Sequence, residues 1–169
     1  KELLHKYFTE GISMSDYKVG DKQLPFQIIE EYTGEQLSGV NYHQLLNYAQ
    51  PTDGDAFRVI LADFVTTEDG TGIVHIAPSF GADDNLVARQ NGIGSLTLVD
   101  GQGRFTKEMA ELSGQYVKEE FYTESDEKPK YPADVQIVIN LKDKNRLFKS
   151  EKYEHSYPHC WRTDKPILY

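Results

Sequence analysis

Cysteine is nearly absent from this sequence, which has only Cys160 among its 169 residues. A single thiol cannot form an internal disulfide, which excludes a small secreted scaffold held by disulfides and favours a reducing compartment. No run of about 18 apolar residues occurs, so a membrane-spanning helix is not expected. Residues 1–5 also lack the order of charged, apolar and small residues that is typical of a signal peptide. We therefore expect a cytoplasmic protein without a membrane partner.

Basic residues are in the minority, with 18 Lys and Arg against 27 Asp and Glu and a net charge of −9. This balance excludes a protein that binds nucleic acid over its whole surface. The distribution is uneven, because residues 142–169 hold seven bases against four acids. Two interpretations stay open for this part: it faces a phosphate backbone, or it is a mixed, solvated surface. The 38% hydrophobic fraction is enough for a core.

Several short segments are rich in β-branched and aromatic residues and are bounded by turn residues, which is typical of strands. The expected strands are residues 26–31, 57–66, 71–77 and 96–99. The sequence Glu68-Asp69-Gly70 favours a turn, so the second and third strands are expected to form a hairpin.

Two helices are expected between these strands. The first covers residues 82–90, with acidic residues in its first turn and Asn91-Gly92 as its stop. The second covers residues 133–147, where Pro132 at the start outweighs a β-branched composition. Strands interleaved with helices predict a single α/β domain.

The expected strand at 71–77 carries a histidine in an apolar setting. Because strand side chains alternate between faces, Val74 and Ile76 are expected to face the core. Ile73, His75 and Ala77 then share the other face. A histidine in such a position is either a binding-site residue or an ordinary hydrogen-bonded one.

Acidic residues follow that strand after a turn through Pro78-Ser79-Phe80-Gly81. Asp83 and Asp84 then lie in the first turn of the expected helix. The ends of strands followed by such turns are where α/β folds place ligands, so we expect His75 and Asp84 to line one small pocket. The alternative is that the acids only complement the helix dipole. A phosphate-binding loop is excluded, because no Gly-Lys-Ser/Thr follows.

Two segments carry a family resemblance. Residues 70–84 read GTGIVHIAPSFGADD, and residues 155–169 read HSYPHCWRTDKPILY. Both resemble the connective-peptide editing domain of isoleucyl-tRNA synthetases, which are class I aminoacyl-tRNA synthetases. The resemblance extends from about residue 57 to 169, and more faintly back to residue 1. His75 distinguishes the pattern from valyl relatives, where lysine is typical, and from leucyl relatives, where methionine is typical.

The resemblance implies one editing-domain fragment over 1–169, with about 150–169 returning toward the catalytic core. The implied fold is a β-barrel-like mixed sheet core with surrounding helices, expected to lack its N-terminal part. The implied activity is hydrolysis of the ester of mischarged valyl-tRNA(Ile), as part of an isoleucine–tRNA ligase. One missing methylene is worth only about 1–3 kcal/mol, a limit for which this synthetase family is itself the standard example. A second site must therefore accept the smaller valyl group, reject the larger isoleucyl group and cleave the ester.

The resemblance also assigns roles to residues. Asp84 would bind the α-ammonium group of the substrate, and His75 would line the amino-acid pocket and exclude isoleucine by size. These two are the implied catalytic residues, and Ile73, Ala77 and Asp83 are expected to complete the substrate pocket. Water would attack the ester carbonyl, helped by the terminal hydroxyl of the tRNA. The implied partners are the tRNA(Ile) 3′ end, the valyl moiety and the catalytic core of the synthetase.

No cofactor is expected in this domain, and ATP and Mg²⁺ belong to the full-length enzyme. Relatives often carry Cys-Trp-Arg-Cys where this chain has Cys160-Trp161-Arg162-Thr163, so half of a zinc site is broken. His155 and His159 lie on an expected extended segment and would not share a helical face, so no metal is expected. Trp161 and Arg162 are expected to anchor the domain to the catalytic core, or else to contact the tRNA end.

The chain departs from the family because the threonine-rich peptide that supplies much of the pocket has no match. Its adjacent threonines, Thr66-Thr67, belong to the expected hairpin. Whether this segment alone hydrolyses the ester therefore stays open, and without nucleotide-binding signatures it cannot aminoacylate. The alternatives are a non-catalytic insertion that positions the tRNA 3′ end, the editing domain of a valyl or leucyl relative, or an acidic α/β domain that binds a protein.

Overall fold

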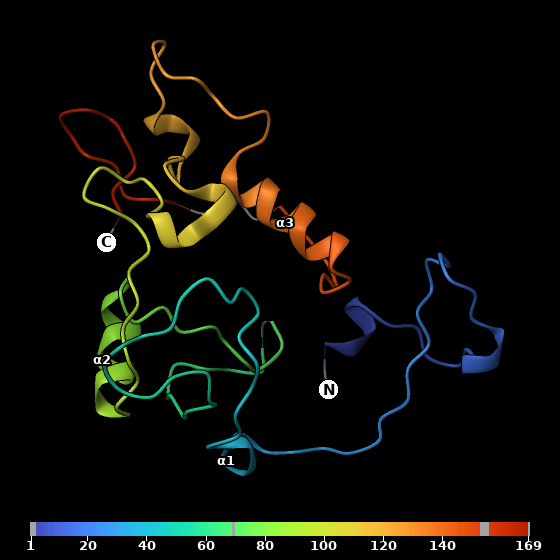
Figure 1. Ribbon diagram of the computed structural model, residues 1–169. Helices are drawn as coiled ribbons and strands as arrows, with labels where there is room; N and C mark the ends of the chain where they lie inside the picture. The colour runs from blue at the N-terminus through green and yellow to red at the C-terminus, as the bar shows by residue number, and fades with distance from the viewer. Residues whose placement is uncertain (1–2, 69, 153–155, 169) are drawn as a thin grey trace. The chain divides into compact units, whose positions relative to one another are not determined.

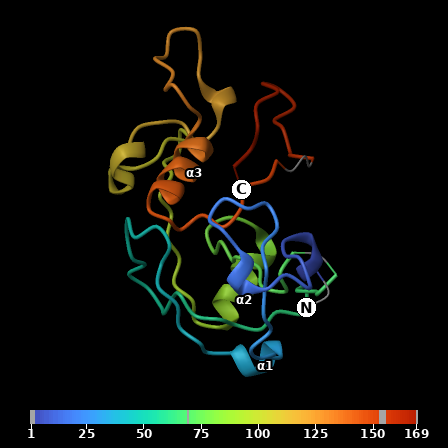
Figure 2. The same cartoon turned by 90° about the vertical axis from the view of Figure 1, so that its right-hand side faces the viewer.

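The computed structural model of the protein describes residues 3–68, 70–152 and 156–168. The chain divides into two compact units: unit 1 comprises Lys1–Gln44 and Ala56–Ala77, and unit 2 comprises Leu45–Asp55 and Pro78–Tyr169. Short helices are joined by long irregular segments in both views of the ribbon (Figures 1 and 2). None of the described helices has the length and hydrophobicity that a bilayer crossing requires.

The expected β-barrel-like mixed sheet is wrong, because the described residues contain no β-strand. Their sheet-type pairing is limited to five isolated bridges. A strand needs a ladder of successive pairs with a neighbour, and each extended segment here meets its partner at a single residue. The described part of the chain is therefore not an α/β domain but a set of short helices connected by irregular backbone.

The segment 57–66 shows why β-propensity alone misled the prediction. Near its start, Val59 donates a hydrogen bond to Val40 at 2.9 Å, and Gly39 donates one to the Val59 carbonyl at 2.9 Å. The pairing then stops, because the Val65 amide bonds back to the Ala62 carbonyl at 3.2 Å and closes a turn. A segment that turns on itself cannot continue along a neighbour.

The segment 71–77 forms no strand, because it begins with a turn and a bend at residues 71 and 72 and is irregular after them. No bridge of the described residues joins it to 57–66, so the expected hairpin is wrong, and Asp69 of its turn lies outside the described residues. Val74 is 53% exposed, although it was expected to face the core. The alternation argument assumed a sheet with one buried face, and that sheet is absent from the described residues.

The described residues of unit 1 form only very short helices, namely the 3₁₀ turns η1 (Leu4–Lys6) and η2 (Met14–Asp16) and the single turn α1 (Gly34–Leu37). The α1 turn begins with a capping box, in which Thr33 and Gln36 exchange side-chain and backbone hydrogen bonds. The segment 26–31, expected as a strand, is irregular. The described part of unit 1 is therefore held by hydrogen bonds between irregular segments, such as that from the Thr9 amide to the Leu24 carbonyl at 2.8 Å, and by aromatic contacts, such as Phe8 with Phe26 at 5.7 Å between ring centroids.

Helix α2 (Ala82–Gln90) confirms the expected helix, including its stop. Asp83 and Asp84 lie in its first turn, where negative charge complements the helix dipole. At its end, Gly92 has a φ of +65°, which glycine adopts without strain. The Ile93 amide then donates to the Ala88 carbonyl at 2.9 Å and closes the terminus.

Helix α3 (Ala133–Asp143) confirms the second expected helix, which ends four residues earlier than expected. It begins directly after Pro132, and the Gln136 amide donates to the Pro132 carbonyl at 3.0 Å. It ends because Asn145 adopts a left-handed φ of +53°. Ala133 and Leu141 face inward, whereas Val135 and Ile139 are 38% and 39% exposed.

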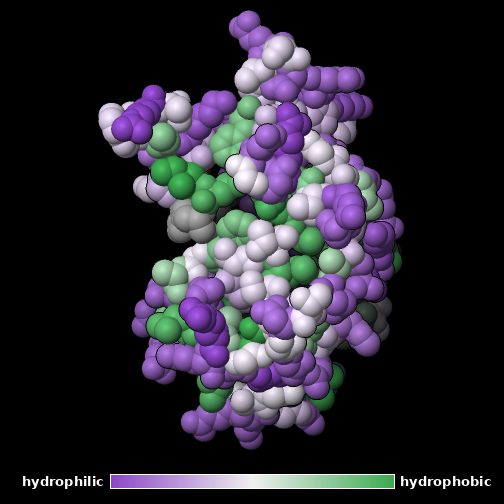
Figure 3. Space-filling model, turned by 60° about the vertical axis from the view of Figure 1, so that its left-hand side comes forward, coloured by the Kyte–Doolittle hydropathy of each residue, from purple (hydrophilic) through white to green (hydrophobic). Residues whose placement is uncertain are grey.

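The core of the described residues lies in unit 2. Its buried positions lie on α2, on the 3₁₀ segment η3 (Lys107–Leu112) and on α3. Its buried hydrophobic residues are Ala88, Met109, Leu112, Ala133 and Leu141. Large hydrophobic side chains are also exposed on the surface among hydrophilic ones, as the space-filling view shows (Figure 3).

The stretch 45–55 belongs to unit 2 although unit 1 flanks it on both sides. Its end pairs with the segment after α2, because the Gly94 amide donates to the Asp55 carbonyl at 2.6 Å and the Asp55 amide donates to the Gly92 carbonyl at 2.9 Å. Its middle is fixed by Tyr48, whose hydroxyl donates to Glu111 at 2.6 Å. The stretch 45–55 is thus a structural part of unit 2.

Candidate functional site

The five residues expected at the site are divided between the two units. Ile73, His75 and Ala77 belong to unit 1, where Ile73 and His75 are exposed and Ala77 is half-buried. Asp83 and Asp84 belong to unit 2. The pocket that His75 and Asp84 were expected to share therefore stays a prediction.

Asp84 is the half-buried acid of the pair, and Asp83 beside it is exposed. The Asp84 carboxylate turns back over Gly81, where a Cβ would lie 3.7 Å from its Oδ2. Gly81 precedes α2 with a φ of +94°, a conformation that disfavours any other residue. The sequence therefore places a carboxylate directly above a bare stretch of backbone.

The loop in front of α2 is fixed by side-chain hydrogen bonds. Asn85 of α2 donates from Nδ2 to the Pro78 carbonyl at 2.8 Å. The hydroxyls of Ser79 and Ser95 lie 2.9 Å apart and share a hydrogen bond. These contacts hold Phe80 and Gly81 in place between them, so the loop presents a defined surface.

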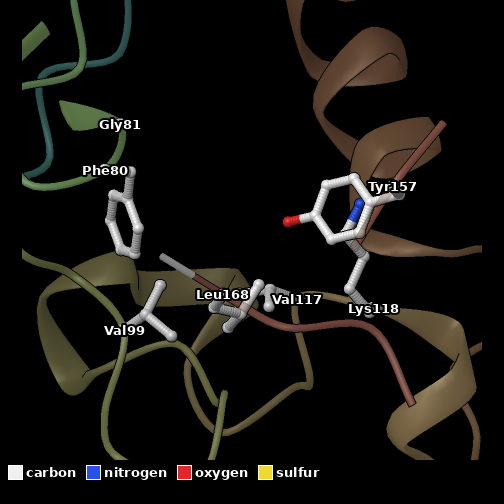
Figure 4. Close-up of a pocket in the computed structure, with 7 residues that line it drawn as sticks. All are labelled: Phe80, Gly81, Val99, Val117, Lys118, Tyr157 and Leu168. Atoms are coloured by element: carbon white, nitrogen blue, oxygen red, sulfur yellow. The ribbon is translucent and has the colours of Figure 1, made fainter. Parts of the chain in front are cut away.

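That surface borders a hollow of about 370 Å³ within unit 2 (Figure 4). Its walls are mostly apolar, with one charged side chain and one hydroxyl among them. The lining residues are Phe80, Gly81, Val99, Val117, Lys118, Tyr157 and Leu168. Gly81, over which the Asp84 carboxylate lies, is one of these lining residues.

Val99 and Val117 reach the hollow from two tight turns. The Asp100 carboxylate accepts hydrogen bonds from the amides of Gln102 and Arg104 at 2.8 and 2.9 Å and so fixes the turn after Val99. The same bonds, that from Arg104 first, hold the pKa of Asp100 below its usual value. The Val117 amide donates to the Gly103 carbonyl at 3.0 Å. The next residue, Lys118, also lines the hollow.

Tyr157 and Leu168 come from the two ends of one closed loop. The Ile167 amide donates to the Pro158 carbonyl at 3.0 Å, and the Cys160 amide donates to the Lys165 carbonyl at 2.8 Å. Closing the loop brings residues 157 and 168 together although ten positions separate them. Leu168 also lies over Gly103, where a Cβ would be 3.5 Å from Leu168 Cδ1 and 2.8 Å from Phe121 Cε2.

The charge of the hollow is concentrated at Lys118. Its Nζ lies 4.4 Å from the centroid of the Tyr157 ring, in a cation–π contact. The Tyr157 hydroxyl points across the hollow in the direction of Phe80 (Figure 4). Lys118 lies on the side of the hollow away from Gly81 (Figure 4).

The segment around Cys160 was considered as half of a metal site. Among residues 3–68, 70–152 and 156–168, no three His, Cys, Asp or Glu side chains lie close enough to hold an ion, and His155 is outside these ranges. A hydrogen bond from the Thr163 hydroxyl, followed by backbone amides, lowers the pKa of the Cys160 thiol. Trp161 is 85% exposed and stacks with Arg162, whose Cζ is 4.5 Å from the ring.

Comparison with known proteins gives a consistent picture. No protein-family model matches the chain. An isoleucine–tRNA ligase of Cytophaga hutchinsonii is 52% identical over 191 residues, which include 100% of this chain and 17% of the relative. One from Bacteroides fragilis is 44% identical over 201 residues, again 100% of this chain and 17% of the relative. The chain belongs to the isoleucine–tRNA ligase family.

A more distant isoleucine–tRNA ligase, from Clostridium novyi, is 42% identical over 99% of this chain and 14% of its own length. The chain thus spans about a sixth of the length of these relatives. The expected resemblance is confirmed over the whole chain, including the part before residue 57 where it was faint. All of these relatives are named as isoleucine–tRNA ligases, which agrees with the expectation from His75 that the pattern is the isoleucyl one and not the valyl or leucyl one.

The lining residues of the hollow were mostly missed from sequence. Phe80 and Gly81 lay inside the expected site region, but Val99, Val117 and Leu168 carry no local signal. They come together only through turns at Asp100 and through the closed loop 158–167. No periodicity or motif in the sequence indicates that convergence.

Proposed function

We propose that this chain is the segment of an isoleucine–tRNA ligase that hydrolyses the ester of mischarged valyl-tRNA(Ile). The observation that carries the proposal is the Asp84 carboxylate, half-buried above Gly81, which is itself a lining residue of a hollow. A carboxylate in the first turn of a helix can pair with the α-ammonium group of an aminoacyl ester. The membership in the ligase family supplies the substrate class.

The chemistry of the proposed reaction needs only water and well-placed polar groups. Water attacks the carbonyl carbon of the ester, and the bond between that carbon and the ribose oxygen breaks. The ribose oxygen takes up a proton, so the products are valine and uncharged tRNA. Asp84 fixes the amino group, which positions the carbonyl for attack by water.

His75 is the second residue in the proposal, as the group that excludes isoleucine by size. Its exposed side chain in unit 1 is compatible with a role toward a substrate bound from outside. Ile73 and Ala77 would lie beside it in that role. ATP, Mg²⁺, the catalytic core and a cytoplasmic location concern the whole ligase and stay predictions.

The proposal is tested by substituting Asp84→Ala in the full-length ligase and measuring deacylation of valyl-tRNA(Ile). We expect a loss of at least about 100-fold in the deacylation rate, as for removal of a single preorganised electrostatic group, while isoleucylation is unchanged. Asp143→Ala is the matched control, because Asp143 is an exposed acid of unit 2 at the end of α3, outside the proposed site. Unchanged deacylation by Asp84→Ala would remove the proposed role.

A second candidate function is a non-catalytic insertion that positions the tRNA 3′ end. Lys118 in the hollow and the basic residues after position 142 favour it. A titration of tRNA binding against salt, run beside the deacylation assay, separates the two functions. Binding with a steep salt dependence and without any deacylation would support positioning alone.

A further inference from the structure

The segment that follows α3, residues 144–152, is basic although the chain as a whole is acidic. It holds four bases against one acid, so it carries a net charge of +3 within a chain whose net charge is −9. A local concentration of positive charge on an acidic protein is the electrostatic footprint of an anionic partner. The four bases of this basic segment are all exposed, and they are Lys144, Arg146, Lys149 and Lys152.

The dipole of helix α3 accounts for only the first of these bases. Positive side chains are favourable in the last turn of a helix, and the effect falls off within that turn. Helix α3 ends at Asp143, with Lys144 as its C-cap residue. Arg146, Lys149 and Lys152 lie beyond the reach of the dipole, so stabilisation of α3 does not explain their charge.

Ion pairs within the chain account for one more base. Lys149 forms an ion pair with Glu151. Arg146 and Lys152 are exposed and form no ion pair with any acid in the part of the chain that the structure describes. The Arg146 amide donates to the Leu141 carbonyl at 2.8 Å, so the backbone that carries this guanidinium is fixed in a turn. An ordered cation on the surface is suited to bind an anion from outside.

An exposed aromatic ring lies among these bases. Phe148 is 64% exposed and follows Arg146 by two positions. Unpaired nucleic-acid bases stack on such rings while positive side chains contact the phosphates beside them. Positive charge alone would suit any anionic partner, whereas the ring and the membership in a family of tRNA ligases favour RNA.

We propose that the basic segment binds the phosphate backbone of tRNA and that Phe148 stacks on an unpaired base beside it. This inference rests on the proposed function, which supplies the tRNA. The basic segment and Asp84 both belong to unit 2, so the RNA that reaches the segment is the end that carries the amino acid. The contact holds the tRNA and takes no part in cleavage of the ester.

The test measures binding of uncharged tRNA(Ile) to the full-length ligase over a range of salt concentrations. Arg146→Gln/Lys152→Gln removes the two bases without ion pairs. Each lost phosphate contact should flatten the slope of log Kd against log salt by about 0.7, so this variant should flatten it by about 1.4. At about 0.1 M salt its Kd should rise on the order of tenfold.

Two further double variants serve as controls. Lys107→Gln/Lys128→Gln removes the same amount of charge from exposed lysines of unit 2 outside the basic segment, and it should leave the slope unchanged. Arg146→Lys/Lys152→Arg keeps both charges and should keep the wild-type slope. An unchanged slope in Arg146→Gln/Lys152→Gln, or an equal change in the Lys107→Gln/Lys128→Gln control, would overturn the proposal.

The stacking contact has a different signature. Phe148→Leu keeps an apolar side chain but removes the ring, so it should raise the Kd about tenfold without changing the slope. Phe64→Leu is its matched control, because Phe64 is an exposed phenylalanine of unit 1. A Kd for Phe148→Leu equal to that of Phe64→Leu would exclude the stacking contact.

The RNA surface and the proposed function fail separately. Uncharged tRNA carries no ester, so the binding titration does not depend on deacylation. If Asp84→Ala still deacylates but Arg146→Gln/Lys152→Gln flattens the slope, the role of Asp84 fails and the RNA surface holds. If Asp84→Ala stops deacylation and Arg146→Gln/Lys152→Gln binds like the wild type, the RNA surface fails alone. In deacylation of valyl-tRNA(Ile), Arg146→Gln/Lys152→Gln should raise KM and leave kcat unchanged.

Discussion

The hydrogen bond between Tyr48 and Glu111 should measurably stabilise unit 2 within a defined range of pH. The Tyr48 hydroxyl donates to Glu111 Oε1 at 2.6 Å, and Asn140 of α3 donates to the same oxygen at 2.9 Å. Burial of the Tyr48 hydroxyl, with the bond to Glu111 second, raises the pKa of Tyr48 to about 12. The same bond, as its main cause, lowers the pKa of Glu111.

The size of the free-energy coupling between Tyr48 and Glu111 follows from the charge of the acceptor, Glu111, and from the exposure of its side chain. A hydrogen bond to a charged group contributes about 1.5–3 kcal/mol when buried. Glu111 is exposed, so screening by solvent reduces the expected coupling to about 0.5–1 kcal/mol. Because the pKa of Tyr48 is raised by folding, Tyr48 contributes fully to the free energy of unfolding below about pH 10. This contribution is lost as the pH rises toward 12. The contribution of Glu111, whose pKa is lowered, is lost as the pH falls below about 4.5.

Two measurements check this reasoning. A double-mutant cycle of Tyr48→Phe and Glu111→Gln, followed by urea unfolding at pH 7, should give a coupling of about 0.5–1 kcal/mol in the free energy of unfolding. The difference in tyrosinate absorbance between wild type and Tyr48→Phe should titrate near pH 12. A coupling of zero at pH 7, or a Tyr48 that titrates near pH 10, would refute the argument.

Two further predictions concern the site and the hollow. His75→Ala in the full-length ligase should enlarge the amino-acid pocket, so that isoleucyl-tRNA(Ile) is also deacylated, and full protection of that product would exclude His75 as the size filter. Gly103→Ala should destabilise the chain by about 2–4 kcal/mol, because the new Cβ would lie 2.8 Å from Phe121 at a φ of +79°. Gly101→Ala in the same turn is its control, since a Cβ there meets nothing within 4 Å and the expected change in unfolding free energy is within about 0.5 kcal/mol.

The helices were predictable because their signals are local. Acidic residues in the first turn and Asn91-Gly92 at the end fixed α2, and Pro132 fixed the start of α3. Only the end of α3 differed, because Asn145 takes a left-handed conformation that a sequence pattern does not specify. Helix start and stop signals depend on residues only a few positions apart, so they act in the same way whatever the tertiary structure around them is.

The sheet was not predictable, because strand formation depends on partners far away in the sequence. The segments 57–66 and 71–77 have strand-like composition, but neither forms a ladder in the described residues. The lining of the hollow could be anticipated only in part, because most of it also depends on partners far away in the sequence. Asp84 and its glycine loop are local features, whereas Tyr157 and Leu168 reach the hollow through a loop closed by distant backbone bonds.

The stretch 45–55 has a consequence for dissecting this molecule. It is separated in sequence from the rest of unit 2 by residues 56–77, which belong to the other unit. A truncated form that starts at Pro78 would therefore discard Tyr48 and the partner that Asp55 provides for Ile93. Any minimal version of the region that holds the hollow has to be cut before Leu45 or rejoined across the excised piece, and simple N-terminal trimming would leave a damaged folding unit.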